Sequence, residues 1–126
     1  MAPVLNAKRA GTQCTGKATF FANVAGSDGT TILTECASLN RLRAAGSEIA
    51  THTWQHTSPA TLSEITRAID HFSQVCLIPR QELRGFRSPF LLYDDTTFGN
   101  LRQAGVTYDA TMMDTMGTLN PNYAWY

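Results

Sequence analysis

The stretch LRAAGSEIATHTWQH, residues 42–56, holds the junction between two predicted elements and the most distinctive polar pair of the chain. Gly46 is the kind of residue that ends a helix in a left-handed conformation. The segment EIATHT after it is apolar and β-branched, which predicts a strand that ends near His52. His56 follows four residues later, and the chain has only three histidines. The stretch therefore predicts a strand that carries two imidazoles to its carboxyl end.

The residues before this stretch predict another strand and a helix. The segment KATFFANV, residues 17–24, is short, aromatic and β-branched, and the turn-forming AGSDGTT follows it. Thr31 or Thr34 can cap a helix that carries Leu39 and Leu42 on one face and ends at the glycine of the opening stretch. A strand, a helix and a strand thus follow one another.

The residues after the stretch repeat this pattern. Ser58 and Pro59 predict the cap and first turn of an amphipathic helix. Its apolar residues recur at steps of three and four: Leu62, Ile65, Ile69, Phe72 and Val75. LRGFRSPF, residues 83–90, predicts a third strand, which Pro89 closes because proline lacks a backbone N–H.

A last helix and strand complete the alternation. Asp94 or Asp95 predicts the cap of a helix that carries Phe98 and Leu101 and ends at Gly105. The segment VTYDATM then predicts a fourth strand. Strands separated by helices of this length indicate an α/β fold with about four parallel strands and intervening helices.

Polar residues lie at the predicted carboxyl ends of three strands. His52 and His56 follow the second strand, Arg87 lies near the end of the third, and Asp109 lies near the end of the fourth. Ligands of such folds gather at this edge because the loops that leave the strands converge there. We therefore expect a functional site at this edge.

Composition argues against several classes of partner. Ten basic and ten acidic residues balance, so no electrostatic pattern favours nucleic acid or an anionic membrane surface. No run approaches the roughly 18 consecutive apolar residues of a membrane span, and the first residues lack the apolar stretch of a secretion signal. Cys14, Cys36 and Cys76 leave two possibilities open, one disulfide with a spare thiol or three buried thiols.

The histidine pair is suited to metal binding. Neutral imidazoles suit zinc and its neighbours, and a catalytic zinc site takes three protein ligands and leaves a position for water. A carboxylate as third ligand would complete a site that lowers the pKa of bound water toward about 7 for attack on an amide or ester. Two alternatives stay open: a pair without metal, with one ring half-buried and one solvated, and an iron site on an unrelated fold.

Two short motifs occur in order along the chain. His52, Thr53 and His56 form His-Thr-x-x-His, and residues 87–90 form Arg-Ser-Pro-Phe. Together they resemble the second and third motifs of the polysaccharide deacetylases, the NodB-homology family of carbohydrate esterases (family 4), especially their chitin deacetylase-like members. The segments CTGKATFF and GVTYDATM add to the resemblance, which covers residues 14–114.

The resemblance implies a metal site and a role for the motif arginine. His52 and His56 would bind a divalent metal, with zinc as the first expectation. Arg87 would orient and charge a catalytic carboxylate through its guanidinium fork, which lysine lacks. The alternative for Arg87 is an ordinary surface cation.

The resemblance also implies substrate contacts and one further catalytic residue. Pro89 and Phe90 would shape a wall of the substrate groove, although a strand stop and a core aromatic explain them equally well. Trp54 would stack on a sugar ring, or else pack in the core as most tryptophans do. Asp109 lies near the acidic residue of the family's fourth motif, which orients the acid histidine.

Two motifs of the family are missing. No Thr-Phe-Asp-Asp, the source of the general base and the third metal ligand, precedes Lys17, and no Leu-x-His with the general acid follows VTYDATM. The pair Asp94 and Asp95 comes in the wrong order and is explained by helix capping. His71 lies on the amphipathic helix next to Phe72, where a half-buried structural role is expected.

The expected organisation is therefore one partial domain over residues 1–126, about half of a NodB-type (β/α) barrel that usually needs roughly 200 residues or more. A sequence fragment, a protein that has lost catalysis, and a half-domain completed by a partner chain all remain possible. We expect the first.

The expected function is removal of acetyl groups from polysaccharides that contain N-acetylglucosamine, by an extracellular or secreted metal-dependent hydrolase. Nucleic acid and membrane are not expected as partners. The isolated chain is expected to be inactive because it lacks the base and acid motifs. The alternative is a non-catalytic carbohydrate-binding or structural module that retains the fold.

Overall fold

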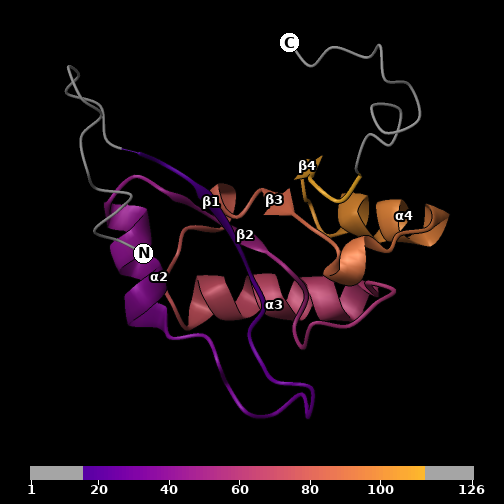
Figure 1. The fold of residues 1–126 in the computed structure, drawn as a ribbon, viewed down its shortest axis with the longest axis horizontal. Helices are drawn as coiled ribbons and strands as arrows, with labels where there is room; N and C mark the ends of the chain where they lie inside the picture. Colours follow the sequence, from indigo (N-terminus) through magenta and orange to yellow (C-terminus); the bar gives the residue numbers. More distant parts are fainter. Residues whose placement is uncertain (1–15, 113–126) are drawn as a thin grey trace, which may run out of the picture.

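The structure, a computed structural model, describes residues 16–112 of the chain. Strands and helices alternate, as the sequence predicts (Figure 1). The elements are β1 (Thr19–Ala22), α2 (Cys36–Ala44), β2 (Glu48–Thr51), α3 (Leu62–Gln74), the 3-10 turn η1 (Arg80–Glu82), β3 (Gly85–Phe86), the 3-10 turn η2 (Pro89–Leu91), α4 (Asp95–Gln103) and β4 (Tyr108–Asp109).

The four strands form one parallel sheet in the order β1-β2-β3-β4. Thr19 lies opposite Glu48, Thr51 opposite Phe86, and Phe86 opposite Asp109. Among the described residues, β1 pairs only with β2 and β4 only with β3, so the sheet is not closed. This arrangement confirms the predicted α/β fold, a partial (β/α) barrel.

The helices cover one face of the sheet and enclose the core with it. In Figure 1, α3 runs across the sheet, with α2 near one end of it and α4 near the other. The core contains residues from both layers: from the strands Phe20, Ile49 and Phe86, and from the helices Leu39, Ile65, Ile69, Phe72 and Leu101. The face that carries these strand residues is therefore the helix face of the sheet.

Helix α3 provides the largest apolar surface, as its sequence period predicts. Ile65, Ile69 and Phe72 are buried on one side, where each is worth about 1.5–3 kcal/mol relative to exposure. Val75 is 61% exposed because the helix has already ended. The cap is the hydroxyl of Thr61, which accepts a hydrogen bond from the Glu64 amide. The predicted cap at Ser58 is therefore wrong, since the cap lies three residues later, at Thr61.

Helix α2 differs from the prediction at its first turn. Its N-cap is Glu35, whose side chain makes no capping bond, so neither Thr31 nor Thr34 caps it. The hydroxyl of Thr34 instead donates to the carbonyl of Asn23. Gly46 follows the helix with φ +89°, the left-handed conformation predicted for it.

A disulfide joins Cys36, the first residue of α2, to Cys76, which follows α3. Asn40 of α2 donates to the Cys76 carbonyl at 2.9 Å and supports the same junction. One disulfide is therefore present, and the alternative of three buried thiols is wrong. Cys14 lies outside the described residues.

Asp94 caps α4, and its role explains the pair of aspartates. Its carboxylate accepts from the Thr97 amide at 2.8 Å, and the Thr97 hydroxyl reaches back to the Asp94 amide. These hydrogen bonds hold the pKa of Asp94 below its ordinary value. The prediction that Asp94 or Asp95 begins this helix is confirmed.

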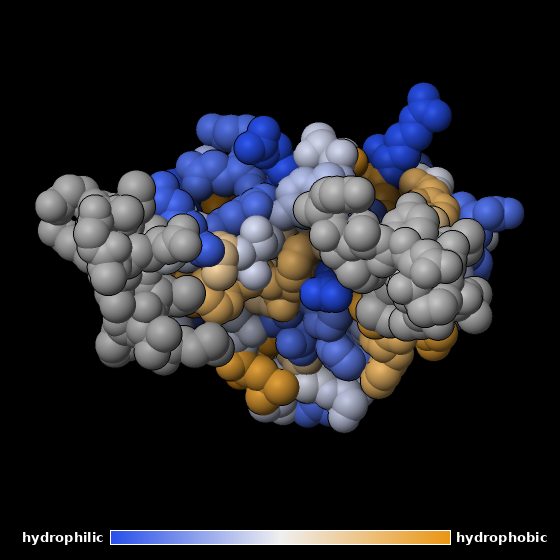
Figure 2. All heavy atoms as spheres, turned by 45° about the horizontal axis from the view of Figure 1, so that its top comes forward, coloured by the Kyte–Doolittle hydropathy of each residue, from blue (hydrophilic) through white to orange (hydrophobic). Residues whose placement is uncertain are grey.

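The surface carries apolar side chains as well as polar ones. Figure 2 shows hydrophobic areas next to hydrophilic ones on the face it displays. Large apolar residues that are exposed include Leu33, Leu77, Phe90 and Leu92. Within residues 16–112, no helix is both long and apolar enough to cross a bilayer.

Candidate functional site

His52 and Arg87 lie on the face of the sheet that the helices leave free. Thr51 lies opposite Phe86, and both are buried toward the helix face. Because successive strand residues point to opposite faces, His52 and Arg87, the next residues of the two segments, point the other way. His52 Nδ1 lies 2.7 Å from the Arg87 carbonyl oxygen, and the Arg87 guanidinium lies 5.8 Å from the Phe21 ring centroid.

His56 returns to His52 through a tight loop. Thr53 and His56 both have left-handed backbone conformations, with φ of 70° and 59°. The two imidazoles lie side by side, with 4.7 Å between ring centroids and planes tilted by 60°. The structure thus brings the two predicted metal ligands together on the same face as Arg87.

The environment of His52 favours a neutral ring with one nitrogen free. Burial lowers its pKa from the ordinary 6.5, a hydrogen bond to the Arg87 carbonyl opposes this, and the charges of His56 and Arg87 lower it further. A carbonyl oxygen can only accept, so Nδ1 must carry the hydrogen. Nε2 then keeps its lone pair, which is the arrangement of a metal-binding histidine.

The pair has no third protein ligand among the described residues. The only group of three potential ligands within residues 16–112 is Cys36, His71 and Cys76, whose ligand atoms lie within 4.8 Å of one another. The two sulfur atoms of that group are bonded to each other, so it offers no thiolate. The His71 ring contacts Trp54, whereas the rings of the other two histidines contact each other.

The Arg-Ser-Pro-Phe motif places one residue at the site and one beneath it. Phe90 is 68% exposed, and its ring meets the His56 ring edge-on at 4.8 Å between centroids. This position fits the predicted groove wall. Pro89 is buried, so its predicted contact with substrate is corrected: it closes the strand segment and begins η2.

Trp54 belongs to the core, which corrects its predicted contact with a sugar ring. The residue is 6% exposed, and its indole N–H donates to the Gly29 carbonyl at 2.8 Å. The Arg67 guanidinium covers the ring at 3.9 Å from its centroid, and His71 meets it edge-on. The loop between the site histidines is therefore anchored inward through this side chain.

Asp109 lies on the helix face, opposite His52 and Arg87. It pairs with the core residue Phe86, and paired residues of a parallel sheet point to the same side. Its carboxylate accepts from the Thr111 hydroxyl, which in turn accepts from the Ser88 amide at 2.7 Å. The structure therefore does not bring Asp109 to the histidine pair, and its observed contacts join β4 to the arginine motif; its predicted catalytic role stays a prediction.

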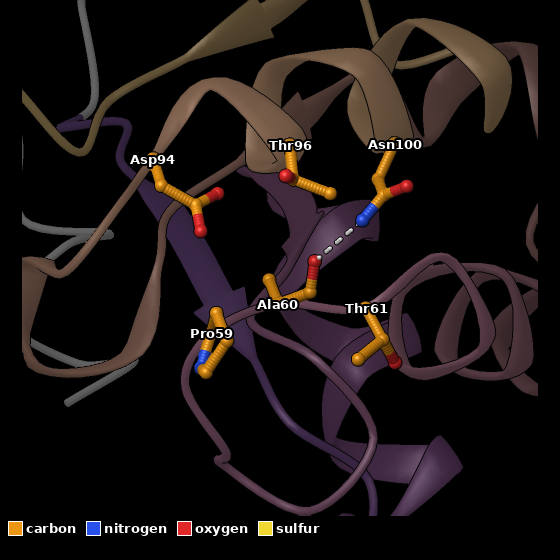
Figure 3. A pocket seen from close by; sticks show the side chains of 6 residues that line it. All are labelled: Pro59, Ala60, Thr61, Asp94, Thr96 and Asn100. Carbon is orange, nitrogen blue, oxygen red and sulfur yellow. Dashed lines mark hydrogen bonds between the residues drawn. The ribbon is translucent and has the colours of Figure 1, made fainter.

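A hollow of about 260 Å³ lies beside the loop that carries His56 (Figure 3). Pro59, Ala60 and Thr61 line one side of it, and Asp94, Thr96 and Asn100 line the other. The Asn100 side chain donates to the Ala60 carbonyl at 3.1 Å and ties α4 to this loop.

Glu64, in the first turn of α3, is a site residue that the sequence interpretation missed. Its carboxylate oxygen Oε2 accepts from the amides of Trp54 and Gln55, at 3.1 and 3.0 Å. The spacing Thr61-x-x-Glu64 is a signal for a helix start, where Glu normally bonds back to the cap residue. It does not reveal that this carboxylate is turned to the preceding loop.

Comparisons with known proteins agree with the fold. Residues 12–108 match the family model described as polysaccharide deacetylase. No curated protein matches the chain. Among solved structures, the chain resembles a family 4 carbohydrate esterase from Streptomyces lividans in complex with acetate, with 20% identity and a TM-score of 0.53 over 74% of this chain and 47% of that one.

A second similar structure is the Xyl-CE4 domain of a multidomain xylanase from the hindgut metagenome of Trinervitermes trinervoides, with 22% identity and a TM-score of 0.46. The match covers 67% of this chain and 40% of that chain. The chain thus spans about half of the Streptomyces esterase. Because the family model covers most of the chain and the fold agrees, the chain belongs to the polysaccharide deacetylase family.

Proposed function

We propose that this chain contributes the histidine ligands of a metal-dependent deacetylase that removes acetyl groups from N-acetylglucosamine-containing polysaccharides such as chitin. The observation that carries the proposal is the contact of His52 with His56 on the free face of the sheet. In addition, His52 Nδ1 is hydrogen-bonded to the backbone carbonyl of Arg87. This contact leaves His52 Nε2 available for a metal.

The donor set fits a divalent metal, and zinc is the first choice for imidazole ligands. When bound, the metal would polarise the acetyl carbonyl and activate the attacking water. Phe90 would hold the sugar against the site with its exposed ring beside His56. Arg87 would orient a carboxylate on the free face. Its guanidinium is available for this role, because the salt bridges among the described residues are made by other arginines.

The complete reaction needs groups that the described residues do not place beside the pair. We propose that further parts of the domain supply the third ligand, the general base and the general acid. The catalytic unit would then be a larger NodB-type barrel of which this chain is a fragment. The Cys36–Cys76 disulfide supports an extracellular or secreted location, because disulfides persist in oxidising compartments.

Zinc titration of the 126-residue chain, followed by histidine ring NMR signals, tests the metal site. We expect the signals of His52 and His56 to shift together, and His52→Ala or His56→Ala to abolish both shifts. His71→Phe is the matched control and should leave them unchanged, because it removes the imidazole and keeps an aromatic edge on Trp54, which anchors the loop. A zinc response that survives both site substitutions would contradict the proposal.

The alternative is a carbohydrate-binding or structural module without catalysis. It is favoured by the lack of a carboxylate beside the histidine pair within residues 16–112. Titration with a chitin oligomer separates the two: a module should bind it equally with and without zinc. The deacetylase proposal expects zinc to tighten binding and His56→Ala to remove that gain.

A further inference from the structure

We infer that Glu64 is the positioning residue that holds His56 against His52. The inference rests on the proposed metal site, but it concerns a residue of another element, helix α3, that lies outside both motifs. Three hydrogen bonds converge on its Oε2: those from the amides of Trp54 and Gln55 and that from the Thr57 hydroxyl at 3.1 Å.

The loop needs such a partner because its backbone is strained. Thr53 is held at positive φ, a conformation that β-branched residues rarely adopt, and His56 is also held at positive φ. Strained conformations persist only where the surroundings fix them. A carboxylate provides the strong charge-assisted acceptor that two adjacent amides require.

The two halves of the loop have different anchors. The carbonyl of Trp54 accepts from the amides of Val24 and Ala25, and its indole is held inside the molecule. His52 is held by the hydrogen bond that its amide donates to the Ala22 carbonyl and by the hydrogen bond between Nδ1 and the Arg87 carbonyl. Before His56, the amides of Trp54 and Gln55 donate to Glu64. After His56, the Thr57 hydroxyl donates to Glu64 and the Thr57 amide donates to the Thr53 hydroxyl. Loss of the carboxylate should therefore displace His56 and leave His52 in place.

A purely structural role in helix capping is the competing explanation. Thr61 is the N-cap of α3 and accepts from the Glu64 amide at 3.3 Å. This bond uses the backbone of Glu64 and leaves its carboxylate free to reach the loop. Thr61→Ala therefore weakens the helix start without removing the acceptor from the loop amides, and it serves as the matched control.

The test compares Glu64→Ala, Glu64→Gln and Thr61→Ala in the 126-residue chain. Zinc affinity is measured by competition with a chromophoric chelator, and unfolding is measured with urea on the same samples. We expect Glu64→Ala to weaken zinc binding at least about tenfold, which corresponds to a loss of about 1.4 kcal/mol in the free energy of binding. Glu64→Gln should recover part of it, since the amide oxygen still accepts. Thr61→Ala should lower stability and leave zinc affinity within twofold of the parent.

Two results would overturn the inference: unchanged zinc affinity in Glu64→Ala, or an equal loss in Thr61→Ala. A parent chain that binds no zinc through its histidines would instead contradict the proposed function. In that case, amide hydrogen exchange of Trp54 and Gln55 and the contact between the His52 and His56 rings still decide the role of Glu64. Faster exchange and a lost ring contact in Glu64→Ala support positioning, and unchanged values refute it.

Discussion

At the scale of single residues, one hydrogen bond decides how His52 can act. Its Nδ1 faces the Arg87 carbonyl, so the neutral ring has its hydrogen there and its lone pair on Nε2. Burial lowers the pKa of His52 and so favours the neutral ring. The same backbone contact joins the two sequence motifs, because Arg87 begins the second of them.

Stability should depend on pH through His52 and His71, since burial lowers the pKa of both below 6.5. The unfolded chain then binds more protons than the folded chain between the folded pKa and 6.5. The stability is therefore complete above pH 6.5 and falls as the pH drops below it, by at most about 1.4 kcal/mol per pH unit and histidine. Urea unfolding at pH 7.5 and 5.5 measures the fall.

His71→Phe should reduce this fall, because the buried Nε2 of His71 has no hydrogen-bond partner among the described residues and phenylalanine keeps an aromatic edge on Trp54. An equal fall in the parent and in His71→Phe would contradict the assignment to His71. His52 would then carry the whole dependence.

The proximity of His52, His56 and Arg87 could be predicted because residues at the carboxyl ends of neighbouring strands lie close together. The positions of the Trp54 and Asp109 side chains could not. The first depends on which way a strained loop turns a large ring, and the second on a strand of two residues whose face is set by pairing with β3. No periodic pattern in the sequence reveals either the loop conformation or the face of the short strand.

Two phenylalanines four residues apart test the division between core and site. Phe86 is fully buried in the core, whereas Phe90 is largely exposed beside His56. Phe86→Ala should lower the free energy of unfolding by about 3–5 kcal/mol, and Phe90→Ala should change it by no more than about 0.5 kcal/mol. Urea unfolding of both variants checks this, and similar losses would mean that Phe90 packs in the core.

At the scale of elements, the alternation and type of helices and strands were predictable, and their starts were less so. Apolar period identified α3, and Gly46 and Gly105 identified two helix ends, because positive φ at these positions favours glycine. The start of α2 could not be predicted, because its N-cap residue, Glu35, makes no side-chain capping hydrogen bond. A disulfide joins the first residue of α2 to Cys76, which follows α3.

Reduction of the Cys36–Cys76 disulfide should lower the free energy of unfolding by about 3–4 kcal/mol. The bond closes a loop with a sequence separation of 40 residues, and such a loop restricts the unfolded chain strongly in the chain-entropy model. Urea unfolding with and without a thiol reductant measures the loss. The double variant Cys36→Ser, Cys76→Ser should match the reduced parent and show no response to reductant.

At the scale of the whole molecule, the sheet is open on both sides among the described residues. Unpaired strand edges are costly to leave exposed, and the Streptomyces esterase is about twice as long as the region that this chain matches. The free face holds His52, His56 and Arg87, and within residues 16–112 no carboxylate lies beside the histidine pair as a ligand. Both observations agree with our proposal that further strands of a larger domain would complete the site.

This incompleteness makes a direct prediction for catalysis. The 126-residue chain supplied with zinc and a chitin oligomer should release no acetate above the level of a protein-free blank. A general base and a general acid are each worth roughly 100- to 10,000-fold in rate, and neither is placed beside His52 and His56 within residues 16–112. Acetate release is followed by a coupled enzymatic assay, with His52→Ala as the control for contaminating activity. Release that a chelator abolishes and His52→Ala lacks would show that the chain supplies its own base and acid, and that half of the barrel is enough for the reaction.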